Sequence, residues 1–257
     1  MSTFLFNEII FGPVSSRRLG VSLGINLLPT NYKFCTFNCV YCECGWTLKA
    51  EKKINLPSRE EVKNELERVL REYEEQGKEI NSITFAGNGE PTIHPDFAEI
   101  IDDTIEMRNI WMPGAQISVL SNASQLNKES VTAALQKVDQ NILKLDAGTE
   151  KTFRIINQSQ EHIKFNKIVD YLKGFQGNLI IQTLFIRGEV EGSYFDNTTD
   201  EEISAWLHLI ADIKPQSVML YPIARDTPAE KLEKIKKDTL EKIALRVNAL
   251  GVKTEVY

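Results

Sequence analysis

The sequence has no long apolar run, no excess of positive charge and no cysteine outside one short segment. A membrane-spanning helix needs an apolar run of about 18 residues, so a membrane protein is not predicted. The N-terminal part also lacks the basic region and the apolar stretch of a secretory signal. With 36 acidic against 30 basic residues, the formal net charge of −6 argues against a broad nucleic-acid-binding surface. We expect a soluble, cytoplasmic protein with no membrane partner.

Low-complexity stretches, internal repeats and linkers rich in Pro, Gly or Ser are absent as well. The 257 residues are 42% apolar and 26% charged, which is ordinary for a globular protein and excludes a largely disordered chain. Barrels of alternating strands and helices often form one domain at this length. We therefore predict a single domain over residues 1–257.

Short β-branched runs alternate with amphipathic helical segments, a pattern typical of a mainly parallel sheet. The expected strands cover residues 22–27, 82–86, 116–120, 141–145, 179–185 and 218–221, with a short terminal strand at 252–256. Capping boxes at Ser58 with Glu61 and at Thr199 with Glu202 mark two helix starts. Further helices are expected near 95–108, 128–138, 149–157, 161–172 and 230–250. This order predicts an α/β fold, a partial (β/α)6 barrel with its site at the carboxyl ends of the strands.

The four cysteines lie close together, at positions 35, 39, 42 and 44. A disulfide framework would spread its cysteines along the chain, so a metal or iron–sulfur site is the better interpretation. Cys35, Cys39 and Cys42 offer three thiolates, whereas an electron-transfer [4Fe–4S] cluster takes four cysteines. Three ligands would leave one iron open to the amine and carboxylate of a small molecule. Because Cys44 follows Cys42 too closely for ferredoxin spacing, a four-cysteine cluster or a zinc site is the less favoured alternative.

The spacing Cys35-x3-Cys39-x-Tyr41-Cys42 resembles the defining loop of the radical S-adenosylmethionine (radical SAM) superfamily. That resemblance implies a [4Fe–4S] cluster on the three cysteines, a fold of the radical SAM barrel type and S-adenosylmethionine as cofactor. The turn Gly87-Asn88-Gly89-Glu90 resembles the superfamily turn that holds the methionine amino group. Glycine at such a turn permits a close backbone approach.

A second resemblance lies before the cysteines. The run from Gly12 to Gly20, followed by Ser22-Leu-Gly-Ile-Asn26, is similar to iron–sulfur oxidoreductases related to the tRNA wyosine-base synthases. Those tRNA enzymes carry additional N-terminal cysteines for a second cluster, and this sequence has no cysteine before Cys35. Its acidic balance also supplies little of the positive charge that RNA binding uses.

The resemblance implies further cofactor contacts at the ends of the third and fourth strands. Lys144 and Asp146 are two positions apart on a strand and so point to the same side of the sheet. A charged pair inside a barrel is costly unless it is satisfied, which favours a functional role. The full expected cofactor-binding set is Tyr41, Gly87, Asn88, Gly89, Glu90, Ser121, Asn122, Lys144, Asp146 and Gln182. For Asn122 a plain turn or capping role is the alternative.

Four arginines are candidates for binding an anionic group of the substrate, because guanidinium groups suit carboxylates and phosphates. They are Arg17, Arg18, Arg187 and Arg225. For Arg17 and Arg18 the alternative is a solvated turn.

The activity that the resemblance implies is reductive cleavage of S-adenosylmethionine to methionine and a 5′-deoxyadenosyl radical, which abstracts hydrogen from a substrate. The substrate could be a small molecule, a modified nucleotide or a partner protein. An activase that installs a glycyl radical on a partner protein is one alternative, and a non-enzymatic iron–sulfur electron carrier is another. An electron donor of the flavodoxin or ferredoxin type is expected.

Overall fold

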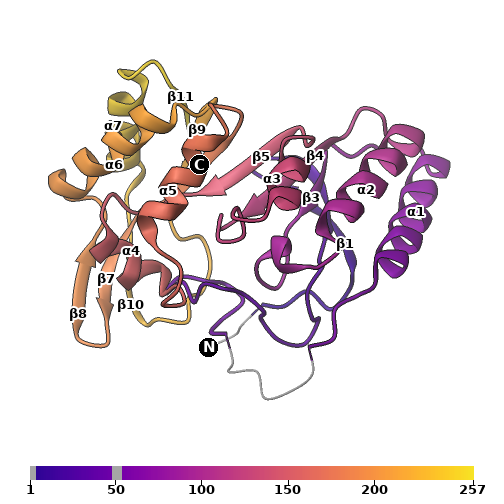
Figure 1. Ribbon diagram of the computed structural model, residues 1–257, viewed down its shortest axis with the longest axis horizontal. Helices are drawn as coiled ribbons and strands as arrows, with labels where there is room; N and C mark the ends of the chain where they lie inside the picture. Colours follow the sequence, from indigo (N-terminus) through magenta and orange to yellow (C-terminus); the bar gives the residue numbers. More distant parts are fainter. Residues whose placement is uncertain (1–3, 48–53) are drawn as a thin grey trace.

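A curved eight-stranded sheet forms the centre of the computed structural model, which describes residues 4–47 and 54–257 (Figure 1). The strand order is β1-β2-β3-β4-β5-β6-β9-β11. All neighbours from β2 to β11 are parallel, and β1 pairs antiparallel with β2. The strands are β1 (Ile10–Ser16), β2 (Gly20–Ile25), β3 (Ser82–Phe85), β4 (Gln116–Ser121), β5 (Gln140–Lys144), β6 (Ile180–Leu184), β9 (Ser217–Tyr221) and β11 (Lys253–Val256).

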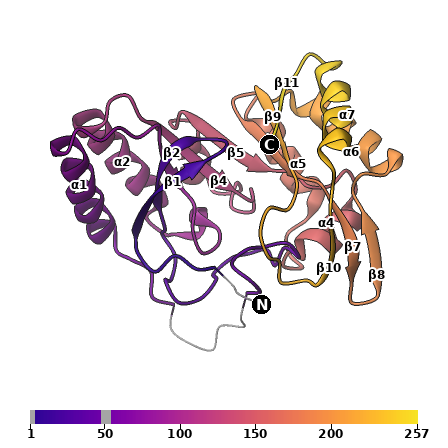
Figure 2. The ribbon, with the colours of Figure 1, turned by 180° about the vertical axis from the view of Figure 1, so that it is seen from behind.

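Helices connect the parallel strands and lie around the outside of the sheet (Figures 1 and 2). They are α1 (Arg59–Glu75), α2 (Phe97–Trp111), α3 (Glu129–Leu135), α4 (Glu150–Asn157), α5 (Phe165–Gly174), α6 (Asp200–Ile213) and α7 (Lys237–Asn248), with a short 3-10 helix at Pro91–Ile93. The six parallel strands β2 to β6 and β9, and the terminal strand β11, were all expected from the sequence. The predicted fold class is confirmed.

Local sequence explains how these elements form. In α1 the residues Val62, Leu66 and Leu70 recur at helical spacing and are buried, so one stripe of the helix faces the sheet. Ser58 and Glu61 make the reciprocal hydrogen bonds of the predicted capping box. All four residues of β3 are buried, as expected for a central parallel strand covered on both faces.

Three parts of the fold differ from the expectation. The edge strand β1 was not predicted, since the expected strands begin at residue 22. The strands β7 (Ile186–Val190), β8 (Ser193–Asp196) and β10 (Lys231–Lys234) form a small separate sheet that was not predicted. The predicted helix over 230–250 was wrong in its first part, because residues 231–234 pair antiparallel with β7. The good helix formers in this segment are overridden by that pairing, and the helix begins at Lys237.

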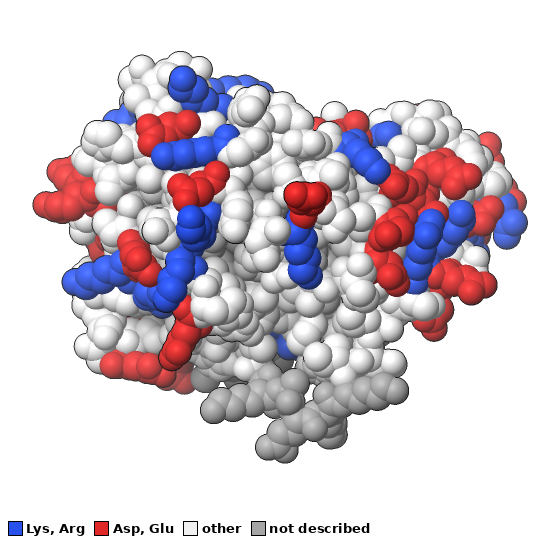
Figure 3. Space-filling model, viewed as in Figure 1, with Lys and Arg blue, Asp and Glu red and all other residues white. Residues whose placement is uncertain are grey.

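Charged side chains of both signs alternate over α1 and α2, at the right of Figure 3. Arg68, for example, pairs with Glu65 and with Glu72 at 2.6 Å each. In the described ranges, no helix combines the length and the apolar character that crossing a membrane requires.

Candidate active site

A cavity of about 470 Å³ lies inside the barrel and brings together most of the residues predicted for the site. Such a volume is in the range of small-molecule pockets. The predicted residues that line it are Arg17, Arg18, Cys35, Cys39, Tyr41, Cys42, Gly87, Gly89, Glu90, Ser121, Asn122, Lys144, Gln182 and Arg225. Of the predicted residues, Asn88, Asp146 and Arg187 are not part of this lining.

The cysteine loop is fixed at both sides of the barrel opening. The Phe34 N–H donates to the carbonyl oxygen of Asn88 at 2.8 Å, which ties the loop to the turn after β3. Farther along, the N–H groups of Asn38 and Val40 donate to the carbonyl oxygens of Asn157 and Ile156, at 3.0 and 2.9 Å. These last two acceptors belong to α4, so the loop also satisfies free carbonyl groups at the end of that helix.

Three polar side chains approach the three predicted cluster cysteines, one for each sulfur. Asn122 Nδ2 lies 3.5 Å from Cys35 Sγ, and Asn157 Nδ2 lies 3.4 Å from Cys39 Sγ. The buried Lys33 ammonium donates to the Gly45 carbonyl oxygen at 3.1 Å, and Cys42 is among the thiols whose charge raises its pKa. Hydrogen bonds of this kind tune an iron–sulfur cluster.

Sequence reasoning missed Lys33 and Asn157. For Lys33, the signal available was a lone cation two positions before Cys35. Asn157 has no such signal, because it is 118 positions from Cys39.

Burial raises the pKa values of the thiols, whereas the positive charge of Lys33 lowers them. Burial raises the pKa of Cys35 to about 12 and also raises that of Cys39. The Cys44 thiol and the Lys33 ammonium lower the pKa of Cys42. Burial opposes the charged form of Lys33, but the neighbouring thiolates hold its pKa above the ordinary value. Lys33 and Cys42 therefore stabilise each other as a cation beside an anion.

The cysteines fit a cluster better than a single ion. Within residues 4–47 and 54–257, no three His, Cys, Asp or Glu side chains converge closely enough to hold one metal ion. Cys35, Cys39 and Cys42 instead stand around one cavity. A cubane cluster gives each iron its own cysteine, so its ligands stand farther apart than those of a zinc ion.

Cys44 lies beside Cys42 but outside the cavity lining. Its sulfur lies 3.5 Å from the carbonyl oxygen of Gly87, and it is absent from the described residues that line the cavity. Among the described residues, the cysteines on the cavity are therefore Cys35, Cys39 and Cys42.

The turn at residues 87–90 is built around close backbone contact with the cysteine loop. Gly89 has a φ of +146°, and a Cβ atom there would lie 1.8 Å from the carbonyl oxygen of Phe34. Gly87 has a φ of +150°, and a Cβ atom would lie 2.4 Å from Asn26 Oδ1. Both positions therefore require glycine, for packing as well as for any ligand.

The polar side chains of the turn are engaged by the protein. Asn88 is fully buried, and its amide donates to the carbonyl oxygens of Phe6 and Pro29 at 2.8 Å each. The Glu90 carboxylate accepts from Ser121 Oγ at 2.8 Å and from the Asn122 N–H at 2.6 Å. Burial raises the pKa of Glu90, while these hydrogen bonds act against that shift. Asn88 thus anchors the N-terminal segment, and Glu90 joins the turn to the end of β4.

A buried network links Tyr41 to the ends of β5 and β6. The Tyr41 hydroxyl donates to Asp146 Oδ2, and Lys144 Nζ lies 2.5 Å from the same hydroxyl and 3.4 Å from Oδ2. Asp146 also accepts from the Leu184 N–H and from Asn157 Nδ2, both at 2.9 Å. Burial opposes the charged form of Lys144, but Asp146 raises its pKa. The charged pair is therefore satisfied, with Lys144 on the cavity and Asp146 behind it.

The four predicted arginines have different surroundings. Arg18 lies on the cavity, whereas Arg225 pairs with Glu43 at 2.6 Å. Arg17 is exposed at the cavity rim. Arg187 does not reach the cavity, because it lies on β7 and pairs there with Asp196 and Glu233, at 3.7 and 3.4 Å. The expectation that Arg187 joins the site fails because the segment after β6 forms a strand instead of a loop.

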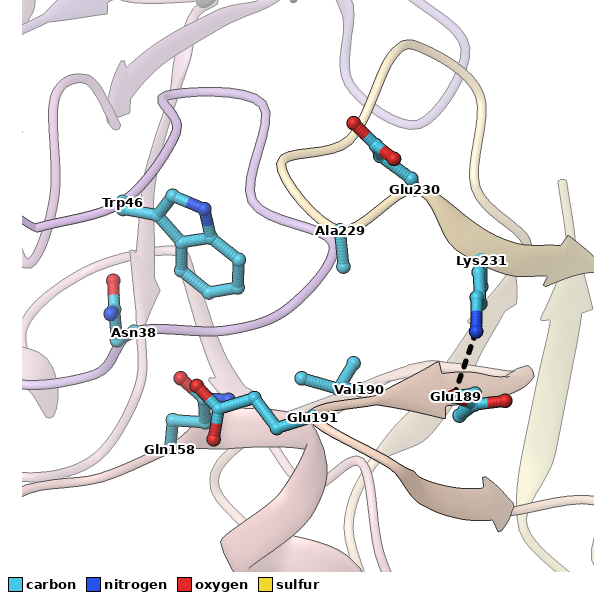
Figure 4. Close-up of a pocket in the computed structure, with 9 residues that line it drawn as sticks. All are labelled: Asn38, Trp46, Gln158, Glu189, Val190, Glu191, Ala229, Glu230 and Lys231. Atoms are coloured by element: carbon cyan, nitrogen blue, oxygen red, sulfur yellow. Dashed lines mark hydrogen bonds and ion pairs between the residues drawn. The ribbon is translucent and has the colours of Figure 1, made fainter.

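A second hollow, of about 440 Å³, lies beside the cysteine loop and opens toward the small sheet (Figure 4). Trp46 forms one side, and Lys231 pairs with Glu189 at 2.8 Å on the other. The remaining lining residues are Asn38, Gln158, Val190, Glu191, Ala229 and Glu230. The residues predicted for the site all lie outside this lining.

Fold, cysteine loop and glycine turn together define a family, and comparison with known proteins agrees. The family model described as "Radical SAM superfamily" matches residues 32–196. The chain belongs to the radical SAM superfamily, whose members are enzymes that use a [4Fe–4S] cluster and S-adenosylmethionine. The predicted family, enzyme class and cofactors are confirmed.

Within the superfamily, the chain groups with proteins of the UPF0026 family. UPF0026 protein slr1464 of Synechocystis is 30% identical over 229 residues, which cover 86% of this chain and 78% of that protein. A protein called GTPase Obg in Brachyspira hyodysenteriae is 32% identical over 238 residues, 91% of this chain. The chain spans 32% of the length of that relative.

A solved structure of TYW1 with a lysine-pyruvate adduct bound has the same fold. The TM-score is 0.65 with 18% sequence identity, over 89% of this chain and 73% of that one. This likeness agrees with the predicted resemblance to wyosine-base synthases at the level of the fold.

Proposed function

We propose that this chain cleaves S-adenosylmethionine reductively and directs the resulting radical to a small molecule inside the barrel. The observation that carries the proposal is the single cavity lined by the three cysteines, the glycine turn and polar groups of the barrel interior. With cluster and S-adenosylmethionine bound, one electron would break a sulfur–carbon bond and yield methionine and a 5′-deoxyadenosyl radical, which takes hydrogen from the substrate.

The residues of this chain would have separate tasks. Cys35, Cys39 and Cys42 would hold the cluster, and their neighbours Asn122, Asn157 and Lys33 would set its electrostatic surroundings. The backbone of the turn 87–90 would receive the methionine part of S-adenosylmethionine. Its close contact with the cysteine loop keeps the two binding elements at a fixed spacing, which favours a preorganised site.

The remaining cofactor contacts would come from β4, β5 and β6. Ser121, Lys144 and Gln182 line the cavity beyond the cysteines and offer hydroxyl, ammonium and amide groups. Tyr41, on the cavity, and Asp146, behind it, hold Lys144 in position. The electron would come from a flavodoxin- or ferredoxin-type donor.

Anaerobically reconstituted protein should hold about four irons per chain, because three cysteines and an open position suit one cubane. After chemical reduction, addition of S-adenosylmethionine should release 5′-deoxyadenosine and methionine in equal amounts, measured by liquid chromatography and mass spectrometry. Cys35→Ala is the negative control. A wild-type protein with full iron content that yields no 5′-deoxyadenosine would contradict the proposal.

A further inference from the structure

The tip of the hairpin between β1 and β2 turns back into the barrel. Ser16 Oγ accepts from the N–H groups of Arg18 and Leu19, at 3.3 and 3.1 Å. Leu19 packs against an apolar group that contains Ile142 and Met219, on β5 and β9. The turn of this hairpin lies at the amino ends of the parallel strands, because Ser16 pairs with Gly20 and Ser22 pairs with Ser82, the first residue of β3. Its tip therefore enters the cavity from the end opposite the cysteine loop, which follows the carboxyl ends of the strands.

Arg18 is held in a defined position at that end. Its Nη1 donates to Gln182 Oε1 at 3.0 Å, and its guanidinium carbon lies 4.8 Å from the centre of the Tyr221 ring. The Tyr221 hydroxyl lies 3.4 Å from the same amide oxygen. One guanidinium edge is therefore used by Gln182 and one face by Tyr221, while the residue still lines the cavity. A guanidinium presents five N–H donors, so donors remain for a ligand.

Arg18 has a neutral environment, unlike Lys144, Arg225 and Lys33 on the same cavity, and it is less exposed than its neighbour Arg17 at the rim. Lys144 is balanced by Asp146, Arg225 by Glu43, and Lys33 faces the thiols. Arg18 is held by an amide oxygen and an aromatic ring, and the described residues place no carboxylate within 4.0 Å of it. A positioned cation without a protein anion, inside a cavity, favours an anionic ligand.

We propose that Arg18 anchors the substrate through an oxyanion group, so that the substrate is a small molecule carrying a carboxylate or a phosphate. This inference rests on the proposed function and specifies its substrate class. The anion would bind at the hairpin end of the cavity, and the rest of the substrate would extend toward the cysteine end. Gln182 and Tyr221 are positioning residues that hold the guanidinium in place.

Two simple anions test the site in reconstituted protein with S-adenosylmethionine present. Inorganic phosphate and acetate are titrated separately by isothermal calorimetry at low ionic strength. The anion that binds more tightly shows whether the oxyanion group of the substrate is a phosphate or a carboxylate. Arg18→Gln should weaken binding at least tenfold. Arg18→Lys should retain an intermediate affinity, because lysine keeps the positive charge but lacks the paired N–H donors of the planar guanidinium group. Arg68→Gln, which removes the same charge from the surface of α1, should bind like the wild type.

Several outcomes would overturn the inference. They are absence of saturable binding of both anions to the wild type, wild-type affinity in Arg18→Gln, or equal loss in Arg68→Gln. Loss of S-adenosylmethionine binding in Arg18→Gln, with iron content and unfolding temperature unchanged, would assign the arginine to the cofactor instead. Because anion binding is measured without turnover, the two failures are distinguishable: absence of S-adenosylmethionine cleavage would contradict the proposed function, and with it the substrate assignment, while saturable binding that depends on Arg18 would still show an anion site.

Discussion

Gly89 and Phe34 are in direct backbone contact across the mouth of the barrel. They form an isolated parallel bridge, and the Glu90 N–H donates to the Phe34 carbonyl oxygen at 3.3 Å. The glycine turn and the cysteine loop are therefore one structural unit. Under the proposed function, a substitution in the turn would therefore affect both S-adenosylmethionine and the cluster, although the two motifs are far apart in the sequence.

Gly89→Ala should disrupt both motifs. The new Cβ atom would meet the Phe34 carbonyl oxygen, and a φ of +146° is strained for alanine. We expect a loss of stability of about 2 kcal/mol or more, together with reduced iron content. Thermal unfolding and iron analysis of the reconstituted protein measure both effects.

Gly114→Ala is the matched control for this change, because a Cβ atom at Gly114 meets nothing within 4 Å. Normal stability and normal iron content in Gly89→Ala would show that the loop and the turn are not coupled.

The sequence predicted the parts of this fold that follow from local pattern. Parallel strands such as β3 are buried runs, and α1 carries its own cap and apolar stripe. The small sheet was missed because its strands are polar and partly exposed, with pairing between residues 186–190 and 231–234. Pairing over such a separation leaves no local signal.

The same distinction holds in the site. Cys35, Cys39 and Cys42 could be predicted as candidate cluster ligands because such ligands recur at a fixed spacing in the sequence. Asn157 reaches Cys39 through the tertiary fold alone. Asn88 was expected on the cavity because of its place in the turn. Its side-chain amide instead donates to the backbone carbonyl oxygens of Phe6 and Pro29. Spacing indicates candidate cluster ligands, but it does not say which side chains of a turn face the cavity.

Lys33→Met should lower the reduction potential of the cluster. The buried ammonium favours the more negative, reduced state, and methionine removes its charge with little change in length. We expect a shift of about 60 mV, which is a tenfold change for a one-electron couple. Potentiometry followed by electron paramagnetic resonance measures it. Lys231→Met, on the surface, should leave the potential unchanged; a similar potential in Lys33→Met and wild type would remove this role from Lys33.

Asn157→Ala should destabilise the network behind the cluster. The substitution removes a hydrogen bond to Asp146 at 2.9 Å and a donor to Cys39 at 3.4 Å. Leaving a buried carboxylate short of a partner costs about 1–3 kcal/mol. The unfolding temperature should fall by about 2–4 °C per kcal/mol. Asn109→Ala, an exposed position on α2, is the control, and equal unfolding temperatures for the two variants would refute the prediction.

Cys44→Ser tests whether the fourth iron is kept open. Cys44 contacts the Gly87 carbonyl oxygen and does not line the cavity among the described residues, so the serine variant should retain about four irons. Its reduced spectrum in electron paramagnetic resonance should still respond to S-adenosylmethionine, because amine and carboxylate would occupy the open iron. Cys35→Ser, a change of the same chemistry on the cavity, should lose the cluster. If Cys44 were the fourth ligand, the wild-type spectrum would not respond to S-adenosylmethionine, and Cys44→Ser would lose iron as Cys35→Ser does.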